Sequence, residues 1–161
     1  PWAVPGTPGL EHRIGGLEKQ DGTGSVSYDP ANHEYMTRVR AAKIAKIADT
    51  IPPLDVDEEG GEDLLVVGWG SSWGTIRAAV RQVRAQGHTV AHAHLRHLNP
   101  FPRNTGDVLK RFGRVLVPEM NNGQLVRMLR SEYLIDAKSY TKIQGQPFSA
   151  AELETEILKR L

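Results

Sequence analysis

The sequence predicts an α/β fold with a mostly parallel sheet that helices cover on both faces. Apolar runs with strand character alternate with segments whose apolar residues repeat at helical spacing, the order expected of a parallel sheet with crossover helices. Residues 64–67 (LLVV) are apolar at every position, as in a strand buried on both faces. A glycine-rich turn, GWGSSWG at 68–74, and a helix follow that strand directly.

The first 30 residues are rich in glycine and proline. They predict an extended segment, residues 1–30, that enters from a preceding domain, and residues 31–161 then form the α/β domain. A helix is predicted over residues 33–48, and its apolar residues keep roughly helical spacing: Tyr35, Met36, Val39, Ala42, Ile44 and Ile47. Pro52 and Pro53 end this helix, and the acidic segment 55–63 predicts a mobile loop.

The helix after the glycine turn has apolar residues at positions i, i+3, i+4 and i+7: Ile76, Ala79, Val80 and Val83. Gly87 is predicted to end this helix as its C-cap. Further strands are predicted at 89–95, 114–118 and 140–143, and a short helix at 106–112.

Two more helices complete the predicted order. One carries Leu125, Val126 and Leu129, and Asn121 or Asn122 is predicted to cap its N-terminus. The last helix begins at a capping box that Ser149 forms with Glu152. Its predicted buried stripe comprises Leu153, Ile157, Leu158 and Leu161.

The composition excludes several kinds of site. No apolar run is long enough to span a membrane, which takes about 18 residues or more. The absence of cysteine excludes disulfides, thiolate zinc sites and cysteine-ligated iron–sulfur clusters within these 161 residues. We therefore expect a reducing, cytoplasmic location. The first residue is Pro1, which fits either loss of an initiator methionine or a segment of a longer polypeptide.

The charges are unevenly distributed, although the net charge is only +1. Residues 64–106 contain no Asp or Glu but several arginines: Arg77, Arg81, Arg84, Arg96 and Arg103. An acidic stretch precedes them: Asp55, Asp57, Glu58, Glu59, Glu62 and Asp63. The pattern favours a solvated loop followed by an ordinary basic surface. The alternative is a positive face for an anionic ligand or an acidic partner protein.

The glycine turn has the position of a ligand crevice, at the carboxyl end of a strand. Its spacing, G-x-G-x-x-x-G, is one residue longer than the dinucleotide fingerprint, and neither a ribose-binding acid nor a P-loop lysine follows. Backbone amides at the helix start could still bind a simple anion. The weak candidates for such a site are Gly68, Gly70, Ser71, Ser72 and Gly74. The favoured interpretation is structural: glycines that let the helix pack close to the strand.

Three histidines and one glutamate are candidates for a catalytic or metal-binding role. His92 and His94 are predicted to share one face of a strand, with His97 nearby, but no third zinc ligand is evident and no metal site is assigned. Glu119 follows a strand and is either a general base or, as we favour, an acceptor of backbone amides in the following turn. No catalytic residue is assigned.

An ordered set of motifs, spanning residue 5 to about residue 133, points to a family. They are PGTPG (5–9), GGLE (15–18), DPANH (29–33), GWGSSWG (68–74), LRHLNPFP (95–102) and PEMNNGQL (118–125). Together they resemble the C-terminal part of the α subunit of 2-oxoacid:ferredoxin oxidoreductases, most closely the type assigned to 2-oxoglutarate in actinobacteria. One departure is that Lys19 and Gln20 stand where the family has His and an acid, which puts a role for that turn in doubt.

The resemblance implies a three-layer α/β/α sandwich like the transketolase C-terminal domain. It also implies a parent enzyme that decarboxylates a 2-oxoacid on thiamine diphosphate, makes an acyl-CoA and passes electrons through an iron–sulfur cluster to ferredoxin. The diphosphate and magnesium site would lie on the β subunit, and the pyrimidine site on earlier domains of the α subunit. This chain has neither a Gly-Asp-Gly…Asn cofactor motif nor cysteine, so none of these cofactors is expected in this segment.

The resulting hypothesis is a non-catalytic assembly domain. Its expected partners are the preceding domains of the α subunit and the β subunit, with ferredoxin binding the complex, and neither nucleic acid nor a membrane is expected. Two alternatives remain. One is a stand-alone anion- or nucleotide-binding module that uses the turn at 68–74, and the other is an interaction protein whose basic stripe binds an acidic partner.

Overall fold

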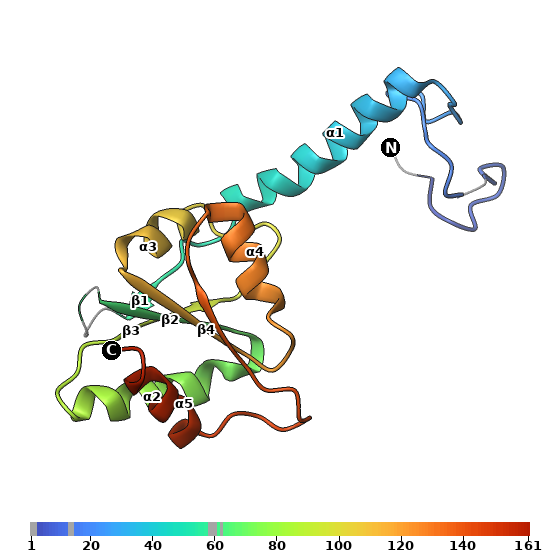
Figure 1. Ribbon diagram of the computed structural model, residues 1–161. Helices are drawn as coiled ribbons and strands as arrows, with labels where there is room; N and C mark the ends of the chain where they lie inside the picture. Colours follow the sequence, from blue (N-terminus) through green and yellow to red (C-terminus); the bar gives the residue numbers. More distant parts are fainter. Residues whose placement is uncertain (1–2, 13–14, 58–60, 62) are drawn as a thin grey trace. The chain divides into compact units, whose positions relative to one another are not determined.

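The computed structural model describes residues 3–12, 15–57, 61 and 63–161 (Figure 1). The chain divides into two compact units, Pro1–Ala45 and Lys46–Leu161. The division falls near the end of α1 (Pro30–Lys46). Each unit is described by itself.

A five-stranded sheet forms the centre of the Lys46–Leu161 unit, in the order β1-β3-β2-β4-β5. Four strands pair in parallel: β2 (Leu64–Trp69), β3 (Ala91–Leu95), β4 (Arg114–Glu119) and β5 (Lys138–Thr141). The two-residue β1 (Val56–Asp57) is antiparallel to β3. The predicted mostly parallel sheet is therefore confirmed.

Helices cover both faces of this sheet (Figure 1). On one face α2 (Trp73–Ala85) packs against α5 (Ala150–Leu158), and α3 (Thr105–Arg111) and α4 (Gln124–Tyr133) lie on the other. Alternate residues of β2 enter opposite cores: Leu64 and Val66 join the core under α2 and α5, and Leu65 and Val67 join the other. This is why the strand is apolar throughout, and it confirms the three-layer α/β/α sandwich.

Several boundaries differ from the prediction. A single 3₁₀ turn (Gly70–Ser72) separates β2 from α2. The last strand pairs with β4 from Leu116↔Lys138 to Glu119↔Thr141, and so lies at 138–141 instead of 140–143. The predicted loop at 55–63 contains β1, and the remainder of that loop at 58–60 and 62 lies outside the described residues. These shifts reflect pairing partners that are distant in sequence.

Of the three predicted caps, one is confirmed and two differ in position. The C-cap of α2 is Gln86, and Gly87, with a left-handed φ of 87°, follows it. Gly123, with a left-handed φ of 78°, holds the N-cap position of α4 instead of Asn121 or Asn122, although the Asn121 side chain does accept amides at this helix start. The Ser149–Glu152 capping box of α5 is present: the Glu152 amide donates to Ser149 Oγ at 3.2 Å, and the Ser149 amide donates to Glu152 Oε2 at 2.6 Å.

Helix α1 begins three residues before its predicted start, at Pro30, and a 3₁₀ turn (Ile47–Asp49) extends it. Proline suits a first helical position because its missing N–H has no partner there in any case. No residue of this fully described helix is buried. Its apolar side chains, Tyr35, Val39 and Ile44 among them, are instead exposed in this chain. The helical spacing was therefore correct, but it does not mark a core within these residues.

Candidate functional site

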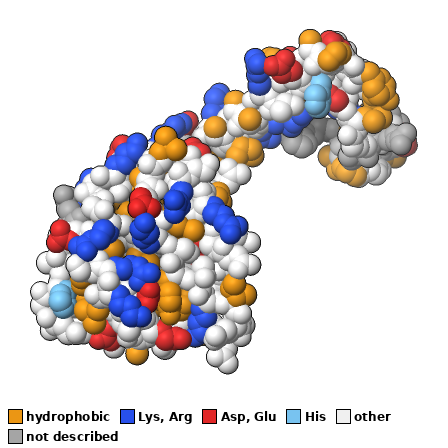
Figure 2. All heavy atoms as spheres, in the orientation of Figure 1, with side chains coloured by type: hydrophobic (Ala, Val, Ile, Leu, Met, Phe, Trp, Pro, Cys, Tyr) orange, Lys and Arg blue, Asp and Glu red, His pale blue; other side chains and the backbone are white. Residues whose placement is uncertain are grey.

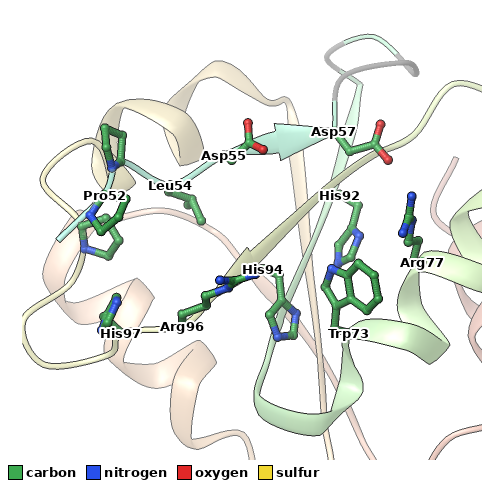
Figure 3. A pocket seen from close by; sticks show the side chains of 12 residues that line it. Pro52, Leu54, Asp55, Asp57, Trp73, Arg77, His92, His94, Arg96 and His97 are labelled. Carbon is green, nitrogen blue, oxygen red and sulfur yellow. The ribbon is translucent and has the colours of Figure 1, made fainter.

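A pocket of about 560 Å³ lies between β3, the start of α2 and the loop that leads into β1 (Figure 3). Strand β3 and the residues after it contribute His92, His94, Arg96 and His97. The first turns of α2 contribute Trp73 and Arg77. Asp55, Asp57 and three prolines complete much of the lining: Pro52, Pro53 and Pro102. The pocket therefore combines imidazole, guanidinium and carboxylate groups with apolar surface.

The two strand histidines lie on one face of β3, as predicted. Their rings are 6.1 Å apart between centroids and meet edge to face. His92 is 4% exposed, and burial lowers its pKa to about 4, with the neighbouring His94 as the second cause. Burial also lowers the pKa of His94. At neutral pH the His92 ring is uncharged, because burial disfavours the protonated form.

The hydrogen bonds of these imidazoles are incomplete. His94 Nε2 lies 3.1 Å from the carbonyl oxygen of Gly70 and, because a carbonyl only accepts, this nitrogen carries the proton. His94 Nδ1 and His92 Nε2 are buried and have no hydrogen-bond partner among the described residues. In a native fold a buried polar atom of this kind usually has a partner, so both nitrogens call for an explanation.

An ion pair between Arg84 and the pocket residue Asp57 links strand β1 to the rest of the sheet. Arg84 of α2 donates to Asp57 Oδ1 at 2.9 Å, to the Asp57 carbonyl at 2.8 Å and to the Val90 carbonyl at 2.9 Å. The guanidinium therefore ties β1 to the chain just before β3. It also compensates the charge of Asp57.

Trp73 and Arg77 form the end of the pocket that α2 supplies. The guanidinium carbon of Arg77 lies 5.0 Å from the centre of the Trp73 ring, a cation–π contact. Trp73 remains 47% exposed, so much of its indole surface is available to a ligand. In Figure 3 these two side chains lie near His92, while His97 and Pro52 lie toward the opposite end.

The glycine-turn candidates lie beside the pocket instead of lining it. A Cβ on Gly68 would lie 2.4 Å from Ile76 Cδ1 and 3.0 Å from His94 Nδ1. Ser72 Oγ donates to the Trp69 carbonyl at 2.7 Å, so its proton is already engaged. Gly70 has a φ of +61°, and Gly74 has open space where a side chain would be. Ser71 is exposed. Gly68 thus serves the close helix packing that we favoured, and anion binding by the turn stays a prediction.

Glu119 holds the start of α4. Its carboxylate is 1% exposed and accepts the Leu125 amide at 2.7 Å and the Val126 amide at 3.0 Å. Asn121 Oδ1 accepts the two preceding amides, from Gly123 at 2.8 Å and Gln124 at 2.9 Å. Together they satisfy the four amides of a helix start that lack partners within the helix. The structural interpretation of Glu119 is therefore confirmed.

Two of the N-terminal motifs meet within the Pro1–Ala45 unit. Glu18 of GGLE accepts a bidentate pair of bonds from Arg40, at 2.9 and 3.1 Å, and contacts His33 Nδ1 of DPANH at 2.7 Å. Arg40, by its hydrogen bonds, lowers the pKa of Glu18 to about 2. Asn32 accepts the Asp21 amide and donates to the Lys19 carbonyl, each at 3.0 Å. Lys19, which differs from the residue that the family has at this position, thus contributes its backbone carbonyl to these contacts.

Sequence reasoning missed the pocket, although it noted most of its charged residues. The carboxylate-free stretch with its arginines is visible in the sequence, but no local pattern places Arg77 and Arg96 beside the histidines. On the face of the molecule that Figure 2 shows, Lys and Arg side chains are interspersed with acidic ones. No helix in the described part of the chain has the length and apolarity needed to cross a bilayer. The same residues contain no cluster of three or more potential metal ligands.

In the comparison with known protein families, residues 62–153 match the model of pyruvate:ferredoxin oxidoreductase core domain II. Among curated proteins, the 2-oxoglutarate oxidoreductase subunit KorA of Mycobacterium tuberculosis is 54% identical over 153 residues, which make up 94% of this chain and 23% of that protein. The chain thus spans less than a quarter of the length of this relative.

Several solved structures resemble this chain, and two of them bear on its family and its fold. The 2-oxoglutarate:ferredoxin oxidoreductase from Magnetococcus marinus, with 2-oxoglutarate, coenzyme A and succinyl-CoA bound, aligns with a TM-score of 0.87 at 34% identity, over 99% of this chain and 28% of that one. A split gene transketolase, an inactive beta4 tetramer, aligns with a TM-score of 0.54 at 18% identity, over 69% and 43% of the two chains. The second likeness concerns the fold alone, and it confirms the transketolase-like architecture.

Proposed function

This chain belongs to the pyruvate:ferredoxin oxidoreductase core domain II family, and from that premise we propose that it is a non-catalytic assembly domain of a 2-oxoglutarate:ferredoxin oxidoreductase α subunit. The parent reaction would be the oxidative decarboxylation of a 2-oxoacid to an acyl-CoA, with electrons passed to ferredoxin. The similarity to the Mycobacterium tuberculosis protein, over nearly the whole of this chain, supports this assignment.

The observation that carries the non-catalytic role is the engagement of Glu119. This carboxylate lies at the carboxyl end of β4, the edge where open α/β sheets place their reactive groups. Its two oxygens are occupied by the Leu125 and Val126 amides, and the side chain has almost no contact with solvent. A carboxylate bound in this way stabilises a helix start and is not free to move a proton to or from a substrate.

The cofactors of the proposed parent enzyme do not fit this chain. Thiamine diphosphate with magnesium requires oxygen ligands that the Gly-Asp-Gly…Asn motif supplies in the family, and that motif is absent from the sequence. An iron–sulfur cluster requires thiolates, and the chain has no cysteine. We therefore assign both groups to other parts of the complex.

The proposed partners are the preceding domains of the α subunit, the β subunit and, for the complex, ferredoxin. Exposed apolar side chains on α1 support an assembly role, because Tyr35, Val39 and Ile44 together leave much apolar surface uncovered in this chain. A cytoplasmic location stays a prediction that rests on the absence of cysteine.

Two measurements test the proposal. In calorimetry, thiamine diphosphate with magnesium should give no saturable binding to this chain, and tight binding would overturn the non-catalytic assignment. In co-expression with the preceding α-subunit domains and the β subunit as separate polypeptides, the chain should co-purify with them. Val39→Glu should weaken this association, while Lys43→Glu, which introduces the same side chain at another exposed position of α1, should weaken it less. Failure of the wild-type chain to co-purify would refute the assembly role.

A further inference from the structure

The pocket beside β3 has more cationic than anionic groups available to a ligand. Arg84 compensates the charge of Asp57, as described above. Arg77 and Arg96 make no hydrogen bond or ion pair with any described residue, although Arg77 lies over the Trp73 ring. Asp55 is the other acidic residue of the lining, so one negative charge remains to offset the two positive charges of these guanidinium groups. The balance of available charge is therefore positive.

A histidine with a buried ring nitrogen that is unpaired in the described part of the chain also lines this pocket. His92 lines the pocket, and its Nε2 is buried without a hydrogen-bond partner among the described residues. Leaving such an atom unsatisfied costs free energy, and native structures usually supply a partner. Among the described residues, no group of three or more potential metal ligands surrounds this nitrogen.

The rest of the lining is suited to an organic molecule. Trp73 presents a half-exposed indole, and Pro52, Pro53 and Pro102 add apolar surface. The volume of about 560 Å³ lies within the range of small-molecule sites, which is about 300–1,000 Å³. Apolar walls with a few convergent polar groups are the usual form of such sites.

We propose that this pocket binds a small organic oxyanion, a carboxylate or a phosphate, with Arg77 contacting the charged group and Trp73 the apolar part, while Arg96 adds positive charge toward the opposite end of the pocket. Guanidinium groups suit this role because their fixed fork of donors matches the oxygens of both anions. This inference goes beyond the assembly role and does not depend on it. A domain can join a complex whether or not it carries a ligand.

Three probes with one ring each test the proposal by calorimetry on the 161-residue chain: phenyl phosphate, phenylacetate and benzyl alcohol. At least one of the two anions should bind saturably, and the neutral alcohol should bind at least about tenfold more weakly. Binding of one anion or of both supports the proposal and identifies the charged group. Equal binding of the alcohol, or no saturable binding of any probe below about 10 mM, overturns it.

Variants locate the binding. Arg77→Gln should weaken anion binding by about tenfold, because it removes a charge-assisted contact. Arg96→Gln removes a more distant charge and should weaken binding less. Both residues are exposed, so the fold should be retained. Arg81→Gln, on α2 but outside the pocket lining, is the matched control and should bind like the wild type. The anion should also shift the tryptophan emission, and Trp73→Phe should abolish that shift. Unchanged affinity in Arg77→Gln would place the ligand elsewhere and refute the assignment.

Discussion

Gly68 stands opposite His94 in the parallel pairing of β2 with β3, and its missing side chain makes room for both the His94 ring and Ile76. An added Cβ would lie 2.4 Å from Ile76 Cδ1 and 3.0 Å from His94 Nδ1. The glycine turn therefore fixes how closely α2 approaches the sheet. It also sets the position of His94 in the wall of the pocket beside β3.

We expect Gly68→Ala to lower the free energy of unfolding by about 1–3 kcal/mol, because an added methyl group overpacks a core that has no free space. Urea unfolding followed by circular dichroism measures this change. Gly74→Ala is the matched control, since a Cβ there meets no atom within 4 Å and alanine favours a helix. Equal effects of the two substitutions would mean that close packing is not the reason for Gly68.

Glu119→Gln should destabilise the unit by about 1–3 kcal/mol, because an amide side chain has one acceptor oxygen for the two buried backbone amides that the carboxylate now satisfies. Thermal unfolding measures the loss. Glu132→Gln makes the same chemical change at an exposed position of α4 and should have little effect. If Glu119→Gln is as stable as the control, the proposed anchoring of α4 is incorrect.

The buried His92 should make stability depend on pH. Its pKa is about 4 in the folded chain against an ordinary value of 6.5, so the unfolded chain binds more protons between these values. The free energy of unfolding should therefore fall as the pH is lowered from about 6.5 to about 4, by up to about 3 kcal/mol from this group. Above that window the contribution is constant.

Urea unfolding from about pH 4 to about pH 7 tests this dependence by comparing the wild type with His92→Gln. The variant should show a shallower loss of stability on acidification, since its side chain does not titrate. His88→Gln removes an exposed imidazole and should retain the wild-type slope. Parallel profiles for the wild type and His92→Gln would contradict the burial argument.

Asn32 should control the order of the turn at residues 20–25. Asn32→Ala removes the acceptor of the Asp21 amide and the donor to the Lys19 carbonyl, so the Asp21 amide should exchange with solvent several times faster. Asn32→Asp keeps the acceptor oxygens and should protect that amide better than alanine does. Hydrogen exchange measured by NMR distinguishes the two variants. Identical exchange in the wild type and both variants would show that Asn32 does not hold the turn.

The predictable features of this fold are those that neighbouring residues encode. The apolar run of β2 and the helical spacing that follows it identify the strand and α2 without knowledge of their partners. The capping box of α5 is equally local, because Ser149 and Glu152 satisfy each other's amides. Features set by distant contacts were missed or misplaced. Strand β1 depends on pairing with β3 and on Arg84, and the register of β5 depends on β4.

The same distinction between local and distant contacts separates what could and could not be predicted of the candidate site. The placement of His92 and His94 on one face follows from the alternation of a strand, and it was predicted. The pocket arises because the loop before β1, the first turns of α2 and the end of β3 come together from separate parts of the sequence. Residue types and local spacing do not indicate that these three segments are adjacent in the fold. The arginines were therefore noted as a charge pattern but not as the lining of a cavity.

Strand β1 also has a consequence for how the molecule behaves when it is concentrated. Without β1, the five residues of β3 would present unpaired backbone groups to any passing extended chain. Two residues, Val56 and Asp57, cover part of that edge, and Arg84 anchors them while placing charges beside it. A short, charged border is a poor template for another copy to add a strand. The Arg84–Asp57 pair thus helps to protect the protein against edge-to-edge aggregation.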